Sequence, residues 1–227
     1  MCEECGCDEA NDLEVEVGAD LLGQNLKYAG HNREHIQNHG VFAVELLSSP
    51  GSGKTSLIEA FIDAMPGLRM AVIEGDIETQ RDAERIRAKG VQAFQLTTGG
   101  ACHLDARLVH GALHHIDLDA ADVLFIENVG NLVCPAAFVL GAHQRWVILS
   151  VPEGDDKPAK YPRVFRESSV FILNKIDLLP YMKFDQERVR AEAFSLNPYL
   201  KFFAVSATLG QGVPELADYL RDLAKKS

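Results

Sequence analysis

The chain has 227 residues, of which 47% are hydrophobic, and its formal net charge is −11. This length suffices for one α/β domain with a short tail, and the hydrophobic fraction supports a sizeable core, which excludes global disorder. An acidic chain without any run of Lys or Arg repels a polyanion on average, so nucleic acid is excluded as a partner. The sequence opens without a basic and apolar leader, and its longest apolar run, Leu132 to Ala142, is too short to span a bilayer. We therefore expect a cytoplasmic protein without a membrane partner.

Residues 1–17 are predicted to form a flexible metal-binding tail, followed by one domain over 18–227 that opens with a helix. The tail holds three of the five cysteines, Cys2, Cys5 and Cys7, followed mainly by acids and by few large apolar groups that could dock it. In a reducing compartment this clustering favours metal binding or thiolate chemistry over a disulfide framework. Three thiols this close can wrap one Ni²⁺ ion, and a redox-active or incidental cluster is the alternative.

The remaining chain alternates between helical and strand patterns. A helix is predicted from about Ala19 to His39, because Gly40 is a usual C-terminal stop. Apolar, β-rich runs predict strands at 41–47, 69–74, 91–96, 123–126, 146–151, 170–173 and 202–205. Helical patterns lie between many of them, at 55–64, 79–88, 104–116 and 214–225. This alternation predicts an α/β fold with a mostly parallel sheet that is flanked by helices on both faces.

A glycine-rich loop follows the first strand and opens a helix, which is the context that a P-loop requires. Its glycines let backbone N–H groups turn toward phosphate oxygens, and the helix N-terminus adds partial positive charge. Lys54 would reach the β- and γ-phosphates, and the Thr55 hydroxyl would bind Mg²⁺. The pattern departs from the usual P-loop at its first position, where Ser48 replaces Gly. The residues predicted to hold phosphate are Pro50, Gly51, Ser52, Gly53, Lys54, Thr55 and Ser56.

Two acids are predicted at the carboxyl ends of strands, where open α/β sheets bind ligands. Asp76 ends the second strand, and we expect it to bind Mg²⁺ and to orient the attacking water. Glu127 opens a segment similar to the acid-x-x-Gly switch of GTPases, in which Gly130 would donate its amide to the γ-phosphate. A solvated strand end or a helix cap is the alternative for either acid. The predicted catalytic set is Lys54, Thr55, Asp76, Glu127 and Gly130.

The motif Asn-Lys-Ile-Asp at 174–177 predicts that the nucleotide is GTP. The carboxylate of Asp177 can accept two hydrogen bonds, from the guanine N1–H and the 2-amino group, and adenine offers no such pair of donors. Lys175 would lie over the purine, and Asn174 would tie this loop to the P-loop. Ser206 and Ala207, which follow a later strand, correspond to the Ser-Ala element that supports the guanine O6 in GTPases.

Soft ligands outside the tail form a second predicted metal site. Cys102 and His103 precede a predicted helix, and Cys134 follows the switch-like segment. All three follow strands near the predicted nucleotide edge, so they can converge on one ion. Two thiolates and one imidazole suit Zn²⁺ or Ni²⁺ and leave a coordination position open. Two buried cysteines and a histidine at a helix start are the alternative.

Five histidines repeat at a spacing of four residues within predicted helices. His31, His35 and His39 would share one helical face, and His110 and His114 would share another. Helical pairs at this spacing can bind metal, but most such histidines belong to solvated faces, and we favour the solvated interpretation at this stage.

Taken together, these motifs make the chain resemble the HypB family of GTPases, accessory proteins for nickel insertion into [NiFe]-hydrogenase. The resemblance covers nearly the whole chain, and the cysteine-bearing segments are its most specific part. It rests on Cys-x-x-Cys-Gly-Cys at 2–7, Ser-Ser-Pro-Gly-Ser-Gly-Lys-Thr at 48–55, Glu-Gly-Asp at 74–76, Cys-His-Leu-Asp-Ala at 102–106, Glu-Asn-Val-Gly-Asn-Leu-Val-Cys-Pro at 127–135 and Asn-Lys-Ile-Asp at 174–177.

The resemblance implies a P-loop GTPase of the SIMIBI-like metallochaperone type that forms a GTP-dependent homodimer. It implies a nickel or zinc site at Cys102, His103 and Cys134 on the dimer interface, and it implies a HypA-like metallochaperone and the hydrogenase large subunit as partners. The urease-type nickel GTPase, whose Cys-Pro-His motif is absent here, and a passive nickel-binding protein remain alternatives. A P-loop kinase is disfavoured by the Asn-Lys-Ile-Asp motif, and the passive protein is disfavoured by the intact Lys54 and Thr55.

Overall fold

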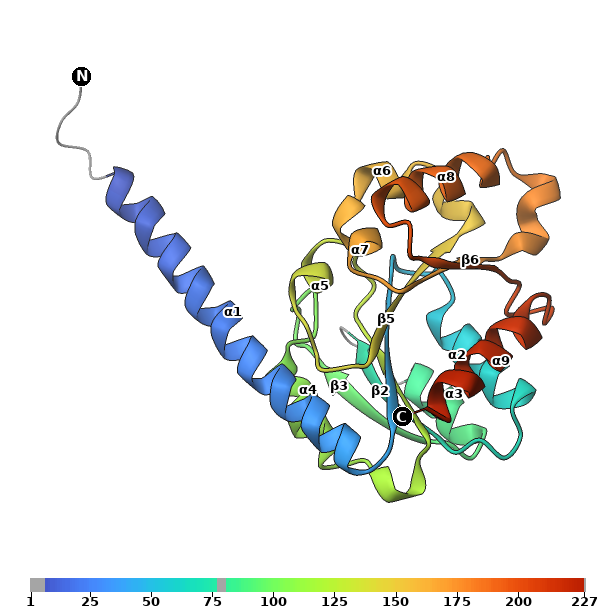
Figure 1. The fold of residues 1–227 in the computed structure, drawn as a ribbon, viewed down its shortest axis with the longest axis horizontal. Coiled ribbons are helices and arrows are strands. Elements are labelled where there is room, and N and C mark those ends of the chain that lie inside the picture. The colour runs from blue at the N-terminus through green and yellow to red at the C-terminus, as the bar shows by residue number, and fades with distance from the viewer. Residues whose placement is uncertain (1–6, 77–80, 227) are drawn as a thin grey trace.

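The protein is built around one seven-stranded sheet in which each pair of neighbouring strands is parallel (Figure 1). The structure, a computed structural model, describes residues 7–76 and 81–226, and for residues 7–20 only the backbone. The strand order is β3-β2-β4-β1-β5-β6-β7. The strands are β1 (Phe42–Ser48), β2 (Met70–Asp76), β3 (Gln92–Thr97), β4 (Val123–Glu127), β5 (Gln144–Ser150), β6 (Val170–Asn174) and β7 (Lys201–Ala204). All seven predicted strands are confirmed.

Helices cover both faces of the sheet, which is why the central strands consist largely of apolar residues. Helices α2, α3 and α9 lie on one side, and α1 and α4 lie on the other (Figure 1). The helices are α1 (Cys7–Asn38), α2 (Lys54–Ala64), α3 (Arg81–Ala88), α4 (Ala106–Leu113), α5 (Cys134–Ala137), α6 (Lys157–Lys160), α7 (Pro162–Arg166), α8 (Gln186–Leu196) and α9 (Val213–Ala224). Within the described residues, none of them is long and apolar enough to cross a membrane.

Alternation along β1 divides the core into two layers. Phe42, Val44 and Leu46 pack with the helices α2 and α9, whereas Ala43 and Leu47 face the opposite layer. The same alternation places residue 45 in that second layer, where a glutamate is unexpected. Because the carboxyl ends of all seven strands meet at one edge, the loops after them form a common rim where ligands can bind.

Helix α1 is longer than the sequence predicted. It begins at Cys7, whereas the sequence predicted a helix from about Ala19 and a flexible tail through residue 17. No proline interrupts the segment 7–38. Cys2 and Cys5 of the predicted tail metal site lie outside the described residues, as does the side chain of Cys7. The metal-binding tail therefore stays a prediction.

Two buried asparagines attach α1 to the start of α4. The Asn25 side chain accepts a hydrogen bond from the Ala106 amide at 2.8 Å and donates to the Val139 carbonyl at 2.9 Å. Two turns later on the same face, Asn32 donates to the carbonyls of Ala106 and Leu140, at 2.8 and 3.0 Å. These bonds hold α1 against the chain that follows residues 102–105.

Candidate functional site

The P-loop connects β1 to α2 and curls around the N-terminus of that helix. Gly51 and Gly53 have φ values of 73° and 94°, in the left-handed region that favours glycine. A Cβ at Gly53 would lie 2.6 Å from Asn174 Nδ2, so the loop has no room for a larger residue there. The buried hydroxyl of Ser52 has no hydrogen-bond partner within the described part of the chain. An unsatisfied donor beside a helix N-terminus fits a phosphate oxygen.

Ser48, which departs from the usual P-loop pattern, contacts the P-loop lysine. The ammonium of Lys54 donates to Ser48 Oγ at 3.0 Å and lies 3.9 Å from Glu127 Oε1. The side chains of Lys54 and Glu127 are largely buried, so the Ser48 hydroxyl and the Glu127 carboxylate hold the positive charge inside the site. The Lys54 ammonium thus points into the site predicted to hold phosphate. A bound phosphate oxygen can replace Ser48 Oγ as its hydrogen-bond acceptor.

The predicted Mg²⁺ ligands converge at the ends of β2 and β4. The Thr55 hydroxyl donates to Glu127 Oε1 at 3.0 Å, and Asp76 lines the same hollow of about 200 Å³. Glu74, which the sequence analysis did not single out, lies there too, and its buried Oε2 has no hydrogen-bond partner among the described residues. This set of oxygen donors fits a hard divalent cation: it comprises the Thr55 hydroxyl, the unpaired Oε2 of Glu74 and the carboxylates of Asp76 and Glu127.

Electrostatics show that this hollow holds an excess of negative charge. Burial, reinforced by the neighbouring carboxylates of Glu127, Asp82 and Asp76, raises the pKa of Glu74 to about 8. Burial also raises the pKa of Glu127 to about 6, although Lys54 opposes the shift. Because the carboxylates repel one another, a bound cation would stabilise their charged forms. The sequence signal for Glu74 was its place at a strand end inside Glu-Gly-Asp.

The switch-like segment 127–130 packs directly on the P-loop. A Cβ at Gly130 would lie 2.8 Å from the Cα of Pro50, so the two backbones touch at this point. Both residues line the hollow that holds the acids. A γ-phosphate between Pro50 and the acids would therefore lie against Gly130.

The motif Asn-Lys-Ile-Asp at 174–177 lies next to the P-loop. Asn174, at the end of β6, donates to the Ser52 carbonyl at 2.9 Å and accepts from the Ala207 amide at 3.1 Å. The Lys175 ammonium donates to the Gly51 carbonyl at 2.6 Å, and Lys175 has a φ of 61°. Asn174 thus joins the three loops of the predicted nucleotide site. Asp177 is half-buried in the short helix Ile176–Tyr181, and Ser206 is buried beside Ala207.

The three soft ligands outside the tail come together. The ligand atoms of Cys102, His103 and Cys134 all lie within 4.8 Å of one another. Cys102 Sγ lies 3.6 Å from His103 Nδ1, and the imidazole packs on the Phe138 ring with ring centres 4.1 Å apart. Burial lowers the pKa of His103, which favours the neutral imidazole that can bind a metal ion. Cys102 is exposed and Cys134 half-exposed, so an ion can reach them.

Direct hydrogen bonds join this metal site to the switch-like segment. Asn128 Oδ1 accepts from the Leu104 amide at 3.0 Å, and Asn131 Nδ2 donates to the Cys102 carbonyl at 3.3 Å. Leu104 also packs against Gly75, where a Cβ would lie 2.7 Å from its side chain. The loop that carries Cys102 and His103 is therefore attached to both strand ends that form the nucleotide hollow.

A buried ion pair in the middle of β1 completes the connection. Glu45, with no exposed surface, accepts from Asn128 Nδ2 at 2.9 Å and from Arg145 Nε at 3.0 Å. Arg145 also donates to the Pro135 carbonyl at 2.7 Å, directly after Cys134. Burial raises the pKa of Glu45, and the positive charge of Arg145 opposes this rise. Sequence analysis missed this network, although an acid inside an apolar strand covered on both faces was a signal for it.

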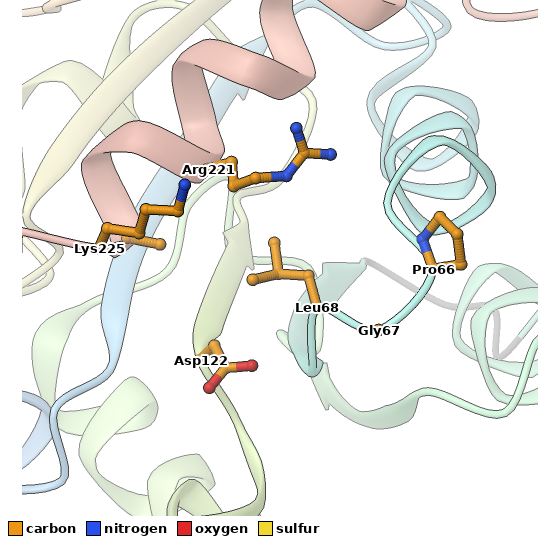
Figure 2. A pocket seen from close by; sticks show the side chains of 7 residues that line it. Pro66, Gly67, Leu68, Asp122, Arg221 and Lys225 are labelled. Atoms are coloured by element: carbon orange, nitrogen blue, oxygen red, sulfur yellow. The ribbon is translucent and has the colours of Figure 1, made fainter.

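A separate hollow of about 430 Å³ lies near Asp122, which precedes β4 at the opposite edge of the sheet (Figure 2). Arg221 reaches into it from α9, and Lys225 from directly after that helix (Figure 2). The Arg221 guanidinium is already paired with Asp218, and Asp122 is paired with Arg69 at 2.6 Å. This hollow is remote from the carboxyl ends of the strands, and we assign it no ligand.

Comparisons with known proteins identify the family. The model of the CobW/HypB/UreG nucleotide-binding domain matches residues 43–204. The hydrogenase maturation factor HypB of Cupriavidus necator is 44% identical over 91% of this chain and 68% of its own length. That of Escherichia coli K12 is 45% identical over 95% of this chain and 74% of its own length. The chain belongs to the HypB family.

Solved HypB structures agree with this assignment. HypB from Helicobacter pylori, solved in complex with nickel, superposes with a TM-score of 0.86 at 38% identity, covering 89% of this chain and 96% of that one. HypB from Archaeoglobus fulgidus superposes with a TM-score of 0.84 at 38% identity, covering 89% of this chain and 100% of that one. The signal recognition particle 54 kDa protein of Aeropyrum pernix, at 13% identity and a TM-score of 0.53, shares the fold alone. The SIMIBI-like P-loop fold expected from the sequence is thus confirmed for this HypB-family chain.

Proposed function

We propose that this chain is a GTP-hydrolysing nickel carrier that assists nickel insertion into [NiFe]-hydrogenase. The observation that carries the proposal is the set of hydrogen bonds from Asn128 and Asn131 to the loop of Cys102 and His103. They attach a soft metal site to the segment that lines the nucleotide hollow. The names of the relatives, hydrogenase maturation factors, and the nickel complex of HypB from Helicobacter pylori support the cargo and its destination.

In the proposed cycle, GTP is held by the P-loop and selected by the carboxylate of Asp177, as the guanine hydrogen-bonding pattern requires. Lys54 leaves Ser48 for the phosphates. Thr55 and Asp76 would hold Mg²⁺, which supplies charge neutralisation between the β- and γ-phosphates. Asp76 orients the attacking water. Turnover is slow, because no arginine finger or switch glutamine is assigned from this chain's sequence.

Coupling to the metal would begin at Gly130. Its amide is drawn to the γ-phosphate, and the segment moves with Asn128 and Asn131, which hold the loop of Cys102. Arg145, through Glu45, carries the same displacement to the backbone beside Cys134. Hydrolysis would reverse these shifts and release the cargo, Ni²⁺ or Zn²⁺.

The surface beside the metal site supports a partner there. A hollow of about 460 Å³ next to Cys134 is lined mainly by apolar side chains, and Val133 is 60% exposed. We infer that this face meets the second subunit of a GTP-dependent homodimer, which would add ligands to the open coordination position. A HypA-like metallochaperone and the hydrogenase large subunit are the proposed partners in delivery, and the cytoplasm is the proposed location.

Two assays test the proposal against its rivals. Phosphate release from GTP without any acceptor, and none from ATP, is expected of a GTPase and not of a kinase. Replacing Lys54 with Ala should abolish hydrogenase maturation while Ni²⁺ still binds at Cys102, His103 and Cys134. Maturation that survives this substitution would identify a passive nickel-binding protein instead.

Service to urease is the second candidate function. The hydrogenase/urease maturation factor HypB of Helicobacter hepaticus is 41% identical over 92% of this chain and 88% of its own length. Complementation of urease activity in cells that lack their own nickel GTPase distinguishes a dual role from a hydrogenase-only role.

A further inference from the structure

Histidines from two neighbouring helices gather on a surface that the proposed function does not use. His35 lies on α1 and His39 directly after it, with ring centres 5.0 Å apart. His110 lies on α4 and His114 directly after it, with ring centres 5.1 Å apart. Across the seam, the rings of His35 and His114 are 5.9 Å apart. We call these four side chains the imidazole cluster.

The spacing matches shared coordination of one ion. Imidazole nitrogens bind Zn²⁺ at 2.0–2.1 Å, so two rings that share an ion have centres about 5 Å apart. Among the described residues, only the ligand atoms of Cys102, His103 and Cys134 already lie within 4.8 Å of one another. Closing the imidazole cluster on an ion therefore requires side-chain rotation, which the exposed His114 can make.

Hydrogen bonds occupy Nδ1 in two of the rings, those of His110 and His39. Asn32 uses its amide NH₂ on the carbonyls of Ala106 and Leu140, so its Oδ1 is the acceptor for His110 Nδ1 at 3.0 Å. His110 Nδ1 must then carry the proton, which leaves Nε2 with a free lone pair. A metal-ligating histidine usually donates its other nitrogen in this way.

His39 is held in the same manner by a carboxylate. Its Nδ1 lies 2.8 Å from Asp119 Oδ1, in the carboxylate–histidine arrangement that orients metal ligands and raises their basicity. A solvated helical face has no need for such partners on two separate histidines. The imidazole cluster thus combines four rings on or directly after two helices with two supporting groups, Asn32 on α1 and Asp119 in the segment Leu118–Ala120.

We propose that the imidazole cluster is a second metal site, which binds one borderline divalent transition-metal ion such as Ni²⁺, Zn²⁺ or Cu²⁺ through His35, His114 and at least one of His39 and His110. Neutral imidazoles suit these ions and disfavour Mg²⁺ or Ca²⁺. The site goes beyond the proposed function, because it shares no residue with the nucleotide hollow or the cysteine site. A bound ion would cross-link α1 to α4.

The test uses the full chain in which Cys2, Cys5, Cys7, Cys102 and Cys134 are all replaced by Ser, which removes the thiolate sites. Calorimetric titration with Ni²⁺ is expected to show one ion per chain. The variant His35→Ala/His114→Ala should bind it at least tenfold more weakly. The control His115→Ala, which removes a nearby histidine whose ring stacks on Phe94 instead, should bind as the parent does. Bound Cu²⁺ should show hyperfine coupling to at least two nitrogens by electron paramagnetic resonance.

Three results would overturn the proposal. The first is the absence of a bound Ni²⁺ ion in the cysteine-free chain. The second is an unchanged Ni²⁺ affinity in His35→Ala/His114→Ala, and the third is a loss of Ni²⁺ affinity in the control equal to that in the double variant. Because His114 is exposed, the single variant His114→Ala should fold normally, and it keeps the test decisive if the double variant does not fold.

Discussion

Replacing Glu45 with Gln should uncouple the metal site from the nucleotide while leaving the fold intact. The carboxylate accepts from both Asn128 and Arg145, at 2.9 and 3.0 Å. An amide has one acceptor oxygen, so one of these bonds must be lost, at about 1.5–3 kcal/mol for a charged hydrogen bond. That loss is offset because Gln no longer has to bury a charge, whose desolvation costs several kcal/mol, and because the buried Arg145 keeps its ion pair with Glu167 at 2.8 Å. The net change in unfolding free energy should stay within about 2 kcal/mol, or a shift of at most about 8 °C in Tm.

Glu45→Gln should change the coupling between nucleotide and Ni²⁺ binding more than it changes the unfolding free energy. Allosteric coupling is typically about 1–3 kcal/mol, which corresponds to a ratio of roughly 5–150 between the Ni²⁺ affinities of the GTP-analogue and GDP states. In Glu45→Gln this ratio, measured by competition titration with a chelating dye, should fall below about threefold. Glu167→Gln is the matched control, because the Glu167 carboxylate accepts from Arg145 at 2.8 Å and from Arg163 at 2.8 Å, whereas the Glu45 carboxylate accepts from Arg145 and Asn128. A wild-type ratio in Glu45→Gln would refute the coupling path.

Three further predictions follow from the nucleotide site. The pKa of folded Glu74 is raised from 4.5 to about 8, so the unfolding free energy of the Mg²⁺-free protein should fall as pH rises through that window. Denaturant titrations of Glu74→Gln should show a smaller fall over the same pH range. The fall in unfolding free energy of the wild type should exceed that of the variant by at most about 5 kcal/mol. Asp177→Asn should bind GTP at least tenfold more weakly in fluorescence titrations and should gain affinity for xanthosine triphosphate, whose 2-carbonyl matches the amide donor; unchanged GTP affinity would exclude Asp177 as the guanine reader. Gly53→Ala adds strain at a φ of 94° and a clash with Asn174, so GTP affinity should fall at least tenfold, whereas Gly67→Ala, with a φ of 95° and open space, should leave it unchanged.

Local patterns made most of the fold predictable. The five central strands are mostly apolar runs buried along most of their length, and the glycines of the P-loop mark the start of helix α2. Helix α8 escaped prediction because it is mostly polar and buries only Val189 and Ala193; its start is marked by Asp185, whose side chain accepts from the Arg188 amide at 2.9 Å. The early start of α1 was missed because acids and cysteines suggested an undocked tail.

The site was predictable where motifs carry the chemistry and hidden where partners are distant in sequence. The approach of Cys102, His103 and Cys134 followed from their places after strands of a parallel sheet. Glu45 and Arg145 lie on neighbouring strands, and only the sheet register brings them together. The support of His110 by Asn32 depends in the same way on how α1 packs on α4.

If the nucleotide and the cysteine site influence each other, the coupling between the two binding equilibria must be reciprocal. The Kd of a non-hydrolysable GTP analogue, in the presence of Mg²⁺, can be measured with and without one equivalent of Ni²⁺ for the wild type and for Cys134→Ala. This Kd should change at least fivefold for the wild type and not at all for the variant. Equal Kd values for the wild type with and without Ni²⁺ would show that the two sites are independent.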